Sequence, residues 1–363
     1  MTIITIILFI FILGLLVFVH ELGHFLAAKL SNIKVEEFAF GFPPKIWSKK
    51  KGETIYAINA IPIGGYVKML GESEESQSLR SFSKKKPGVR AAVSVAGVLM
   101  NVVLTWLILT VGFAIGMSPL VSSPDTIPGK KLRSEVIIAG VETGTPAENS
   151  GIQPGDTIIS GVAGTNKIDF KSASAVSKFT KENLGNTVSL VYKHDNIEKL
   201  TEVKLSDDPN SPLGISIVEN SIIRTPWYLS PVVALREIYR IIVINLVFLK
   251  SFFVQLFSSG ELSKDVGGPV AIYIFTGMAA KAGVMVVAQF IAILSISLAL
   301  INILPFPALD GGRLLFIALE KIFRRKVVKE NVENIIHTIG FALILVFAAV
   351  VTYKDIITWI LKK

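Results

Sequence analysis

Three residues near the amino terminus have the types and the spacing of a metal-dependent hydrolytic site. His20, Glu21 and His24 form a His-Glu-x-x-His pattern. Residues four apart lie on one face of a helix, so His20 and His24 can bind the same metal ion. Glu21 is then placed to act as a general base toward a metal-activated water. The pattern therefore predicts a zinc site with Glu21 as its catalytic residue.

The segment that carries this pattern is otherwise almost wholly apolar from Ile3 to Ala28. A stretch of that length can cross a bilayer, where ionisable side chains are costly and usually functional. We therefore expect the metal site to lie inside a membrane. The alternative is a polar cluster that only joins helices. A secretory signal peptide is disfavoured because the first eleven residues carry no basic region.

Composition supports a membrane protein with one additional soluble domain. The chain has 363 residues, of which 51% are hydrophobic. It has no cysteine, so a zinc ion must be held by histidine and carboxylate side chains. The net charge is +9, and the basic residues cluster in loops beside apolar segments, as the positive-inside rule for membrane proteins expects. We expect the lipid bilayer to be a partner of this protein, and we expect no nucleic-acid partner.

The charge distribution predicts a polytopic α-helical protein with about four transmembrane helices. The basic loops 31–88 and 313–334 are expected on the cytoplasmic side, and the amino terminus outside. His20 lies roughly 25 Å along its helix, which places the metal toward the cytoplasmic face. The predicted spans are 1–30, 89–117, 284–312 and 335–363.

The segment 221–283 is predicted to be interfacial or amphipathic. Its apolar part, 241–257, is short and is interrupted by Lys250. If it crossed the membrane, the loop 313–334 would face outward against its basic charge. We therefore expect this segment to lie at the outer surface.

Within the first loop, residues 54–69 have the composition of a β-hairpin. Apolar and β-branched residues partly alternate, and Gly64 and Gly65 suggest a turn before Tyr66. The hairpin is apolar enough to dip toward the membrane, but an ordinary surface hairpin is equally compatible with the sequence. If it borders the metal site, its edge could pair with an unwound substrate segment.

Residues 118–220 have the character of an inserted extracytoplasmic α+β domain. The stretch 146–159 resembles the Pro-Ala-x-x-x-Gly-hydrophobic-x-x-Gly-Asp-x-Ile pattern of PDZ domains, and 173–184 would form the groove helix. Leu213, Gly214 and Ile215 resemble the element that binds a peptide carboxylate. The domain is expected either to bind a peptide carboxyl terminus or to act as a packing or size-exclusion module.

The end of the third span supplies a further carboxylate. Pro305 and Pro307 cannot continue a regular helix, and Asp310 follows them. Irregular backbone at membrane depth must be buried or face a water-filled cavity. Since Asp310 is expected at the depth of the histidine pair, it is the predicted third ligand of one zinc ion per chain.

Together these motifs resemble the site-2 protease family of intramembrane zinc metalloproteases, in particular the regulator of sigma-E protease type with one PDZ domain. The resemblance covers the His-Glu-x-x-His pattern and the stretch from Asn302 to Gly311. Gly41-Phe42-Pro43-Pro44 looks like the family's Gly-Phe-Gly-Pro element, with Pro43 in place of glycine. Gly268-Pro269-Val270 is similar to the element before the third core helix.

The resemblance implies regulated cleavage of single-spanning membrane proteins, such as anti-sigma factors or remnant signal peptides, in a bacterial inner membrane. It implies that the hairpin lies near the catalytic cleft and that Asn302 binds substrate backbone. The substrate-binding residues expected are Asn302, Pro305, Pro307, Gly64, Gly65 and Tyr66.

Two other functions fit parts of the sequence. A non-proteolytic scaffold could use the PDZ-like domain alone, but it would not need Glu21. A zinc transporter would need a chain of polar residues through the other spans, and the sequence shows only the single cluster near one face.

Overall fold

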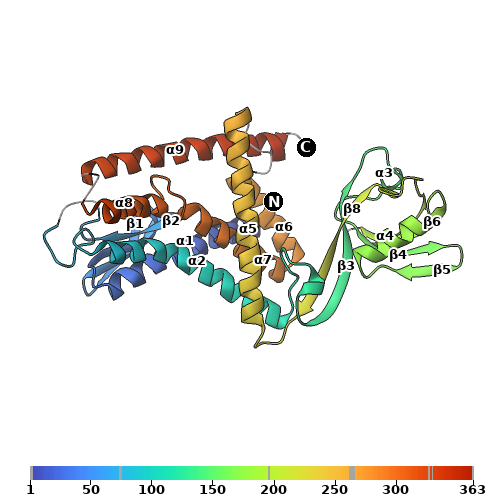
Figure 1. Cartoon of the computed structure of the whole chain (residues 1–363), viewed down its shortest axis with the longest axis horizontal. Coiled ribbons are helices and arrows are strands. Elements are labelled where there is room, and N and C mark those ends of the chain that lie inside the picture. Colours follow the sequence, from blue (N-terminus) through green and yellow to red (C-terminus); the bar gives the residue numbers. More distant parts are fainter. Residues whose placement is uncertain are drawn as a thin grey trace. The chain divides into compact units, whose positions relative to one another are not determined.

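The computed structural model of the chain divides into two compact units (Figure 1). The first unit contains residues 1–110 and 234–363, and the second contains residues 111–233. The structure describes residues 3–72, 76–194, 197–260, 266–325, 328 and 330–361.

Long apolar helices make up most of the first unit. In the described residues, five helices have the length and composition to cross a membrane. The first of them, α1, contains 28 residues, which at 1.5 Å per residue gives about 42 Å and exceeds the hydrocarbon core of a bilayer. The five are α1 (Ile3–Leu30), α2 (Pro87–Ile115), α5 (Ser230–Ser259), α7 (Val284–Asn302) and α9 (Glu330–Ile356).

The sequence predicts about four spans, and the additional candidate among the five helices is α5. It begins at Ser230 and continues for 30 residues through Lys250, so it is much longer than the apolar stretch 241–257. The predicted interfacial segment 221–283 therefore contains two separate helices, α5 and α6 (Pro269–Ala282). Its placement at the outer surface stays a prediction.

The first loop forms a sheet whose pairing differs from the prediction. Residues 54–69 do not fold back on themselves but form one strand, β2 (Thr54–Met69), that pairs with β1 (Val35–Lys51). Both halves of β2 lie against the same part of β1, since Ala39 pairs with Ala57 and with Tyr66. The backbone bends at Gly64, whose φ of +111° favours glycine.

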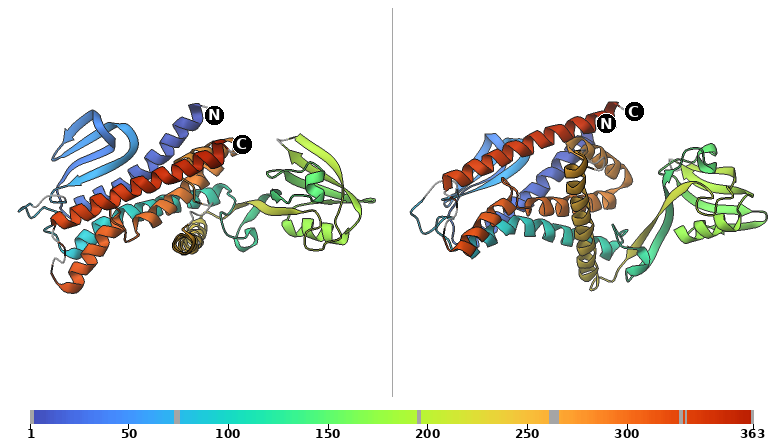
Figure 2. Two further views of the ribbon diagram at one scale, coloured as in Figure 1. Left: turned by 90° about the horizontal axis from the view of Figure 1, so that it is seen from above. Right: turned by 45° about the horizontal axis from the view of Figure 1, so that its top comes forward.

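This sheet lies beside the carboxyl-terminal half of α1 in both views of Figure 2. A buried apolar cluster joins the sheet to α1 and α2 and includes Ala28, Val67 and Val93. In the register of the described residues, Gly65–Met69 pair with β1 on one side only. The sheet is thus fixed next to the helix that carries the histidine pair, with one strand at its edge.

The proline-rich turn after α7 ends that helix at Asn302, as the sequence predicts. A new helix, α8 (Asp310–Phe323), starts at Asp310, so the carboxylate occupies the first helical position. The remaining helical element of this unit, η2, is a π-helical turn at Ile357–Leu361.

The second unit is an α+β domain with its own core. Six strands form a sheet in the order β7-β6-β4-β3-β8, with β5 paired to β4. The helix predicted over 173–184 is present as α4 (Ala173–Glu182), and its buried face includes Val176 and Phe179. Its role beside a peptide groove stays a prediction. The elements are η1 (Pro124–Thr126), β3 (Lys130–Val141), α3 (Pro146–Asn149), β4 (Thr157–Ala163), β5 (Asn166–Asp169), α4 (Ala173–Glu182), β6 (Thr187–His194), β7 (Ile197–Lys204) and β8 (Ile215–Arg224).

Candidate active site

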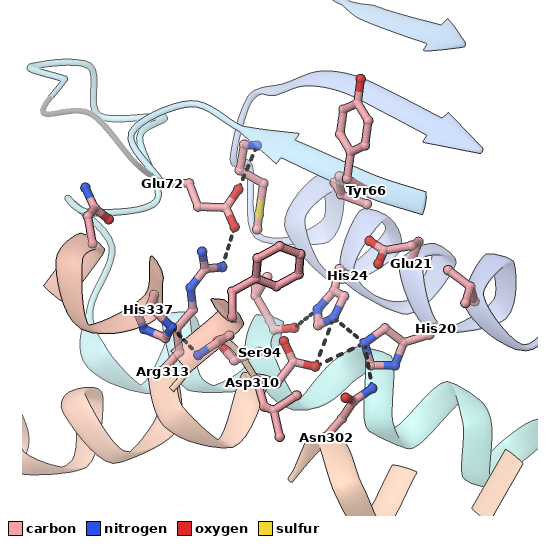
Figure 3. Close-up of a pocket in the computed structure, with 18 of the residues that line it drawn as sticks. His20, Glu21, His24, Tyr66, Glu72, Ser94, Asn302, Asp310, Arg313 and His337 are labelled. Carbon is pink, nitrogen blue, oxygen red and sulfur yellow. Dashed lines mark hydrogen bonds and ion pairs between the residues drawn. The ribbon is translucent and has the colours of Figure 1, made fainter. Parts of the chain in front are cut away.

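Two histidines and one aspartate from distant parts of the chain meet in the first unit. The Nε2 atoms of His20 and His24 lie 3.2 Å apart on one face of α1. Asp310 Oδ2 lies 3.1 Å from His20 Nε2 and 3.3 Å from His24 Nε2. Figure 3 shows the three side chains turned toward one another. Among the residues described, this is the one group of three metal-ligating side chains close enough to share an ion.

The spacing of these atoms suits a tetrahedral zinc ion. With zinc–nitrogen bonds of about 2.0–2.1 Å, two ligand nitrogens lie roughly 3.3 Å apart. The three donor atoms of His20, His24 and Asp310 match that spacing, and both histidines are buried. Two imidazoles and one carboxylate also form a donor set that zinc uses in catalytic sites, with the fourth position left for water.

A neighbouring carbonyl sets the tautomer of His24. Its Nδ1–H donates to the carbonyl oxygen of Val93 on α2 over 2.8 Å. With the proton on Nδ1, the lone pair of Nε2 points to Asp310 and is available for a metal. The side-chain nitrogen of Asn302 lies 3.5 Å from His20 Nε2. The predicted substrate-binding residue Asn302 therefore borders the ligand group.

Glycines allow α2 to approach the histidines closely. A Cβ at Gly97 would lie 2.4 Å from His24 Nε2 and 2.7 Å from His20 Cε1. A Cβ at Gly23 would lie 2.3 Å from the carbonyl oxygen of Ala96. Both positions need glycine because a methyl group would collide with the site or with the helix backbone. Sequence reasoning missed Gly97, since nothing local in α2 reveals this contact.

The catalytic candidate Glu21 lies between the histidine pair and β2. A Cβ at Gly65 would lie 3.3 Å from Glu21 Cγ, so the strand backbone passes directly beside this side chain. Tyr66 extends away from the ligand group in Figure 3, and its hydroxyl donates to Glu37 over 3.0 Å. The backbone at Gly65 thus lies directly beside Glu21.

The turn that carries Asp310 is shaped by packing against α9. A Cβ at Gly340 would lie 2.5 Å from Pro307 Cβ, so the helix and the turn are in tight contact. Ala308 has a φ of +75°, and its N–H donates to Nδ1 of His337 over 2.8 Å. Pro307 is therefore part of a turn packed against α9, and His337 is a neighbour that the sequence did not indicate. The predicted role of Pro305 and Pro307 in substrate binding stays a prediction.

A cavity of about 770 Å³ opens beside the ligand group. Glu21, Asn302 and Tyr66 line it together with the two histidines and Asp310. Charged and polar side chains on its far side come from the loop after β2 and from α8 and α9. These are Glu72, Arg313, Glu333, Asn334, His337 and Thr338.

The predicted carboxylate-binding residues lie in the second unit. Leu213 is buried in the domain core, and Ile215 begins β8, a strand at the end of the sheet order. Gly214 has a φ of +75°, and a Cβ there would lie 2.2 Å from the side chain of Thr145. The three residues thus form a tight turn that leads into an edge strand next to α4.

Comparison with known proteins assigns the chain to one protein family over almost its whole length. The pattern of peptidase family M50 matches residues 8–347. A Clostridium perfringens protein with the provisional name zinc metalloprotease is 37% identical, over 94% of this chain and 95% of its own length. Zinc metalloprotease RasP of Shouchella clausii is 30% identical over 97% of this chain and 98% of its own length. A solved PDZ domain from Listeria monocytogenes matches 23% of the chain with 25% identity and a TM-score of 0.20.

Proposed function

Since this chain belongs to peptidase family M50 and is a zinc metalloprotease, we propose that it cleaves peptide bonds within or near the transmembrane segments of single-spanning membrane proteins. One observation carries this proposal. The His-His-Asp group and Glu21 lie on and beside α1, a helix apolar and long enough to cross a membrane. We therefore expect the scissile peptide bond to reach Glu21 from a membrane-embedded segment of the substrate.

The chain's own residues have separable roles in the proposed reaction. His20, His24 and Asp310 would hold one zinc ion, which when bound supplies Lewis-acid polarisation and an activated water. Glu21 accepts a proton from the attacking water and delivers it to the nitrogen of the leaving amine. Val93 keeps His24 in the ligating tautomer through its carbonyl oxygen. The side-chain amide of Asn302 holds the substrate backbone beside the ligands.

The edge of β2 is the proposed docking site for the scissile segment. A transmembrane helix shields its peptide bonds with its own hydrogen bonds, so the substrate must unwind before it can be cut. Gly65–Met69 pair on one side only in the described register, and Gly65 passes next to Glu21. An extended substrate segment that adds to this edge would have its backbone groups satisfied and would lie next to the catalytic carboxylate.

We propose a bacterial inner-membrane location with the active site toward the cytoplasm. The basic loops 31–88 and 313–334 support this orientation, with the amino terminus and the second unit outside. On this topology the second unit, as a PDZ domain, lies on the outer side and meets the extracytoplasmic part of a membrane-embedded substrate. It would either bind a new carboxyl terminus at Leu213–Ile215 or exclude bulky ectodomains.

The proposal is tested by cleavage and zinc content measured on the same purified protein. Wild type in detergent should bind one zinc per chain and cut a single-spanning test substrate. Glu21→Gln should bind zinc equally and cut nothing, because the amide cannot accept a proton. Asp310→Ala should lose both. Retained cleavage in Glu21→Gln would remove Glu21 from its assigned role.

A further inference from the structure

One carboxylate outside the ligand group connects two elements of the site. Glu72 follows β2 in the chain, and its Oε2 accepts the backbone N–H of Met69 over 3.1 Å. Its other oxygen, Oε1, accepts from the guanidinium of Arg313, which is 241 residues away in sequence. The side chain of Glu72 is 14% exposed, and that of Arg313 is 31% exposed. Both side chains stand in the wall of the cavity (Figure 3).

The two partners of Glu72 belong to two different parts of the proposed site, the docking edge of β2 and the helix that begins with Asp310. Met69 is the last residue of β2 and ends the edge where substrate would dock. Arg313 is in α8, three residues after Asp310, and residues three apart are neighbours on a helix surface. A continuous connection therefore runs from the docking edge through Glu72 and Arg313 to the helix that begins with the third ligand.

We propose that Glu72 and Arg313 are a positioning pair that sets the distance between the docking edge of β2 and the metal ligand Asp310. This inference rests on the proposed function, because it assigns the pair a role in placing the scissile bond. The pair does not touch the reacting atoms. It holds the bound backbone at the distance from the ligands that cleavage requires.

The energetics of positioning predict a particular kinetic effect. In a variant without the Glu72–Arg313 pair, the edge of β2 is still exposed for pairing with the substrate, so the affinity for substrate changes little. The bound peptide bond, however, is held at a variable distance from the ligands, and a misplacement of about 1 Å can cost on the order of 100-fold in rate. We expect Glu72→Ala to lower kcat by about 10-fold or more, with KM within about threefold of wild type.

Conservative variants separate charge from hydrogen bonding. Glu72→Gln keeps an oxygen that can accept the Met69 N–H but loses the ion pair, so its kcat should lie between those of wild type and Glu72→Ala. Arg313→Lys keeps the positive charge and should retain more activity than Arg313→Ala.

A matched control exists at the other end of the same strand. Glu53 precedes β2 and pairs with Arg80 and Lys29 outside the cavity. Glu53→Gln removes a comparable ion pair by the same change of side chain as Glu72→Gln. Its kcat should equal that of wild type, because the pair does not connect β2 to α8.

A distance measurement tests the pair without relying on activity. The chain contains no cysteine, so two introduced thiols carry spin labels at unique positions. Lys68→Cys on β2 and Lys321→Cys on α8 are both at exposed residues. Pulsed electron–electron double resonance should give one narrow distribution of distances between the two spin labels in the otherwise wild-type chain. Glu72→Ala and, to a smaller extent, Glu72→Gln should broaden or shift it, and Glu53→Gln should leave it unchanged.

Each outcome decides the inference. A broadened distribution together with the kcat loss supports it. An unchanged distribution with a kcat loss overturns it, since Glu72 would then act directly on the reaction, and a broadened distribution with normal kcat overturns it as well. If wild type cuts no substrate, the proposed function fails. The distance distribution then decides separately whether the pair fixes β2 against α8.

Discussion

His337 accepts a hydrogen bond at Nδ1 from the backbone N–H of Ala308, and this 2.8 Å contact connects α9 to the turn that carries Asp310. Ala308 is held at a φ of +75°, a conformation that costs an alanine roughly 1–2 kcal/mol. The packing of Gly340 against Pro307 lies directly beside this contact. The orientation of Asp310, the proposed third ligand, therefore depends on a helix that contributes no residue to the ligand group.

We expect His337→Phe to weaken zinc binding because the Ala308 N–H loses its acceptor and the turn relaxes. Partners of this kind usually change metal affinity by about 10–100-fold, and the lower end is expected here. His337→Asn offers an oxygen near the position of Nδ1 and should retain most of the affinity. Competition with a zinc chelator measures the effect. Equal affinity in wild type and His337→Phe would show that the contact does not orient Asp310.

Gly97→Ala should prevent zinc binding. The added methyl group would lie 2.4 Å from His24 Nε2, so either the histidine or α2 must move. Overpacking of this kind typically costs about 1–3 kcal/mol, and here the displaced atom is a ligand.

Gly88→Ala is the matched control for Gly97→Ala, because it is on the same helix and its Cβ would meet nothing within 4 Å. Zinc content and thermal unfolding in detergent should be close to wild type for this variant. A Gly97→Ala protein with full zinc content would contradict the close approach of α2.

Asp355 should be important for stability and not for chemistry. Its Oδ2 accepts the N–H groups of Gly268 and Ala271 at the start of α6, over 2.9 and 3.0 Å. Loss of such a cap typically costs about 1–2 kcal/mol, and Asp355 is buried. Asp355→Ala should lower the midpoint of thermal unfolding in detergent, and Asp355→Asn, which keeps an acceptor, should lower it less. Equal midpoints for the two variants would contradict the capping role.

The ion pair at Glu53 predicts an acid-dependent contribution to stability. Hydrogen bonds from Arg80 and then Lys29 lower the pKa of Glu53 from 4.5 to about 2. A carboxyl whose pKa is lower in the folded state stabilises the fold above its unfolded pKa and loses that effect as pH falls through the folded value. The stability difference between wild type and Glu53→Gln should be constant above about pH 5 and disappear as the pH falls from 4.5 toward 2. A difference that grows with acid would contradict this ion pair.

Parts of the His20–His24–Asp310 group could be predicted because the sequence signals for those parts are local. The four-residue spacing of His20 and His24 places both on one helix face, and the prolines before Asp310 end α7 where the sequence indicates. The helix α4 was predicted in a different way, from the resemblance of this region to PDZ domains. The histidine spacing and the end of α7 each needed only a short stretch of sequence and one physical rule, whereas placing Asp310 beside the histidines also needed the predicted topology of the whole chain.

The remaining features depend on contacts between distant segments. The partner of β2 was missed because β1 contains two prolines and three consecutive lysines, which do not read as a strand. The length of α5 was underestimated because Lys250 interrupts its apolar run. Glu72, Arg313 and Gly97 acquire their roles only when α2, α8 and β2 meet around the ligands, and no local pattern marks them.

The central claim is tested most directly by locating the bond that the protein cuts. Purified protein with zinc is incubated in detergent with a single-spanning substrate, and the products of wild type and Glu21→Gln are identified by mass spectrometry. We predict that wild type cuts within or at the edge of the apolar segment and that Glu21→Gln gives no such product. Cleavage confined to the polar flanks, or the same product from Glu21→Gln, would contradict intramembrane proteolysis at this site.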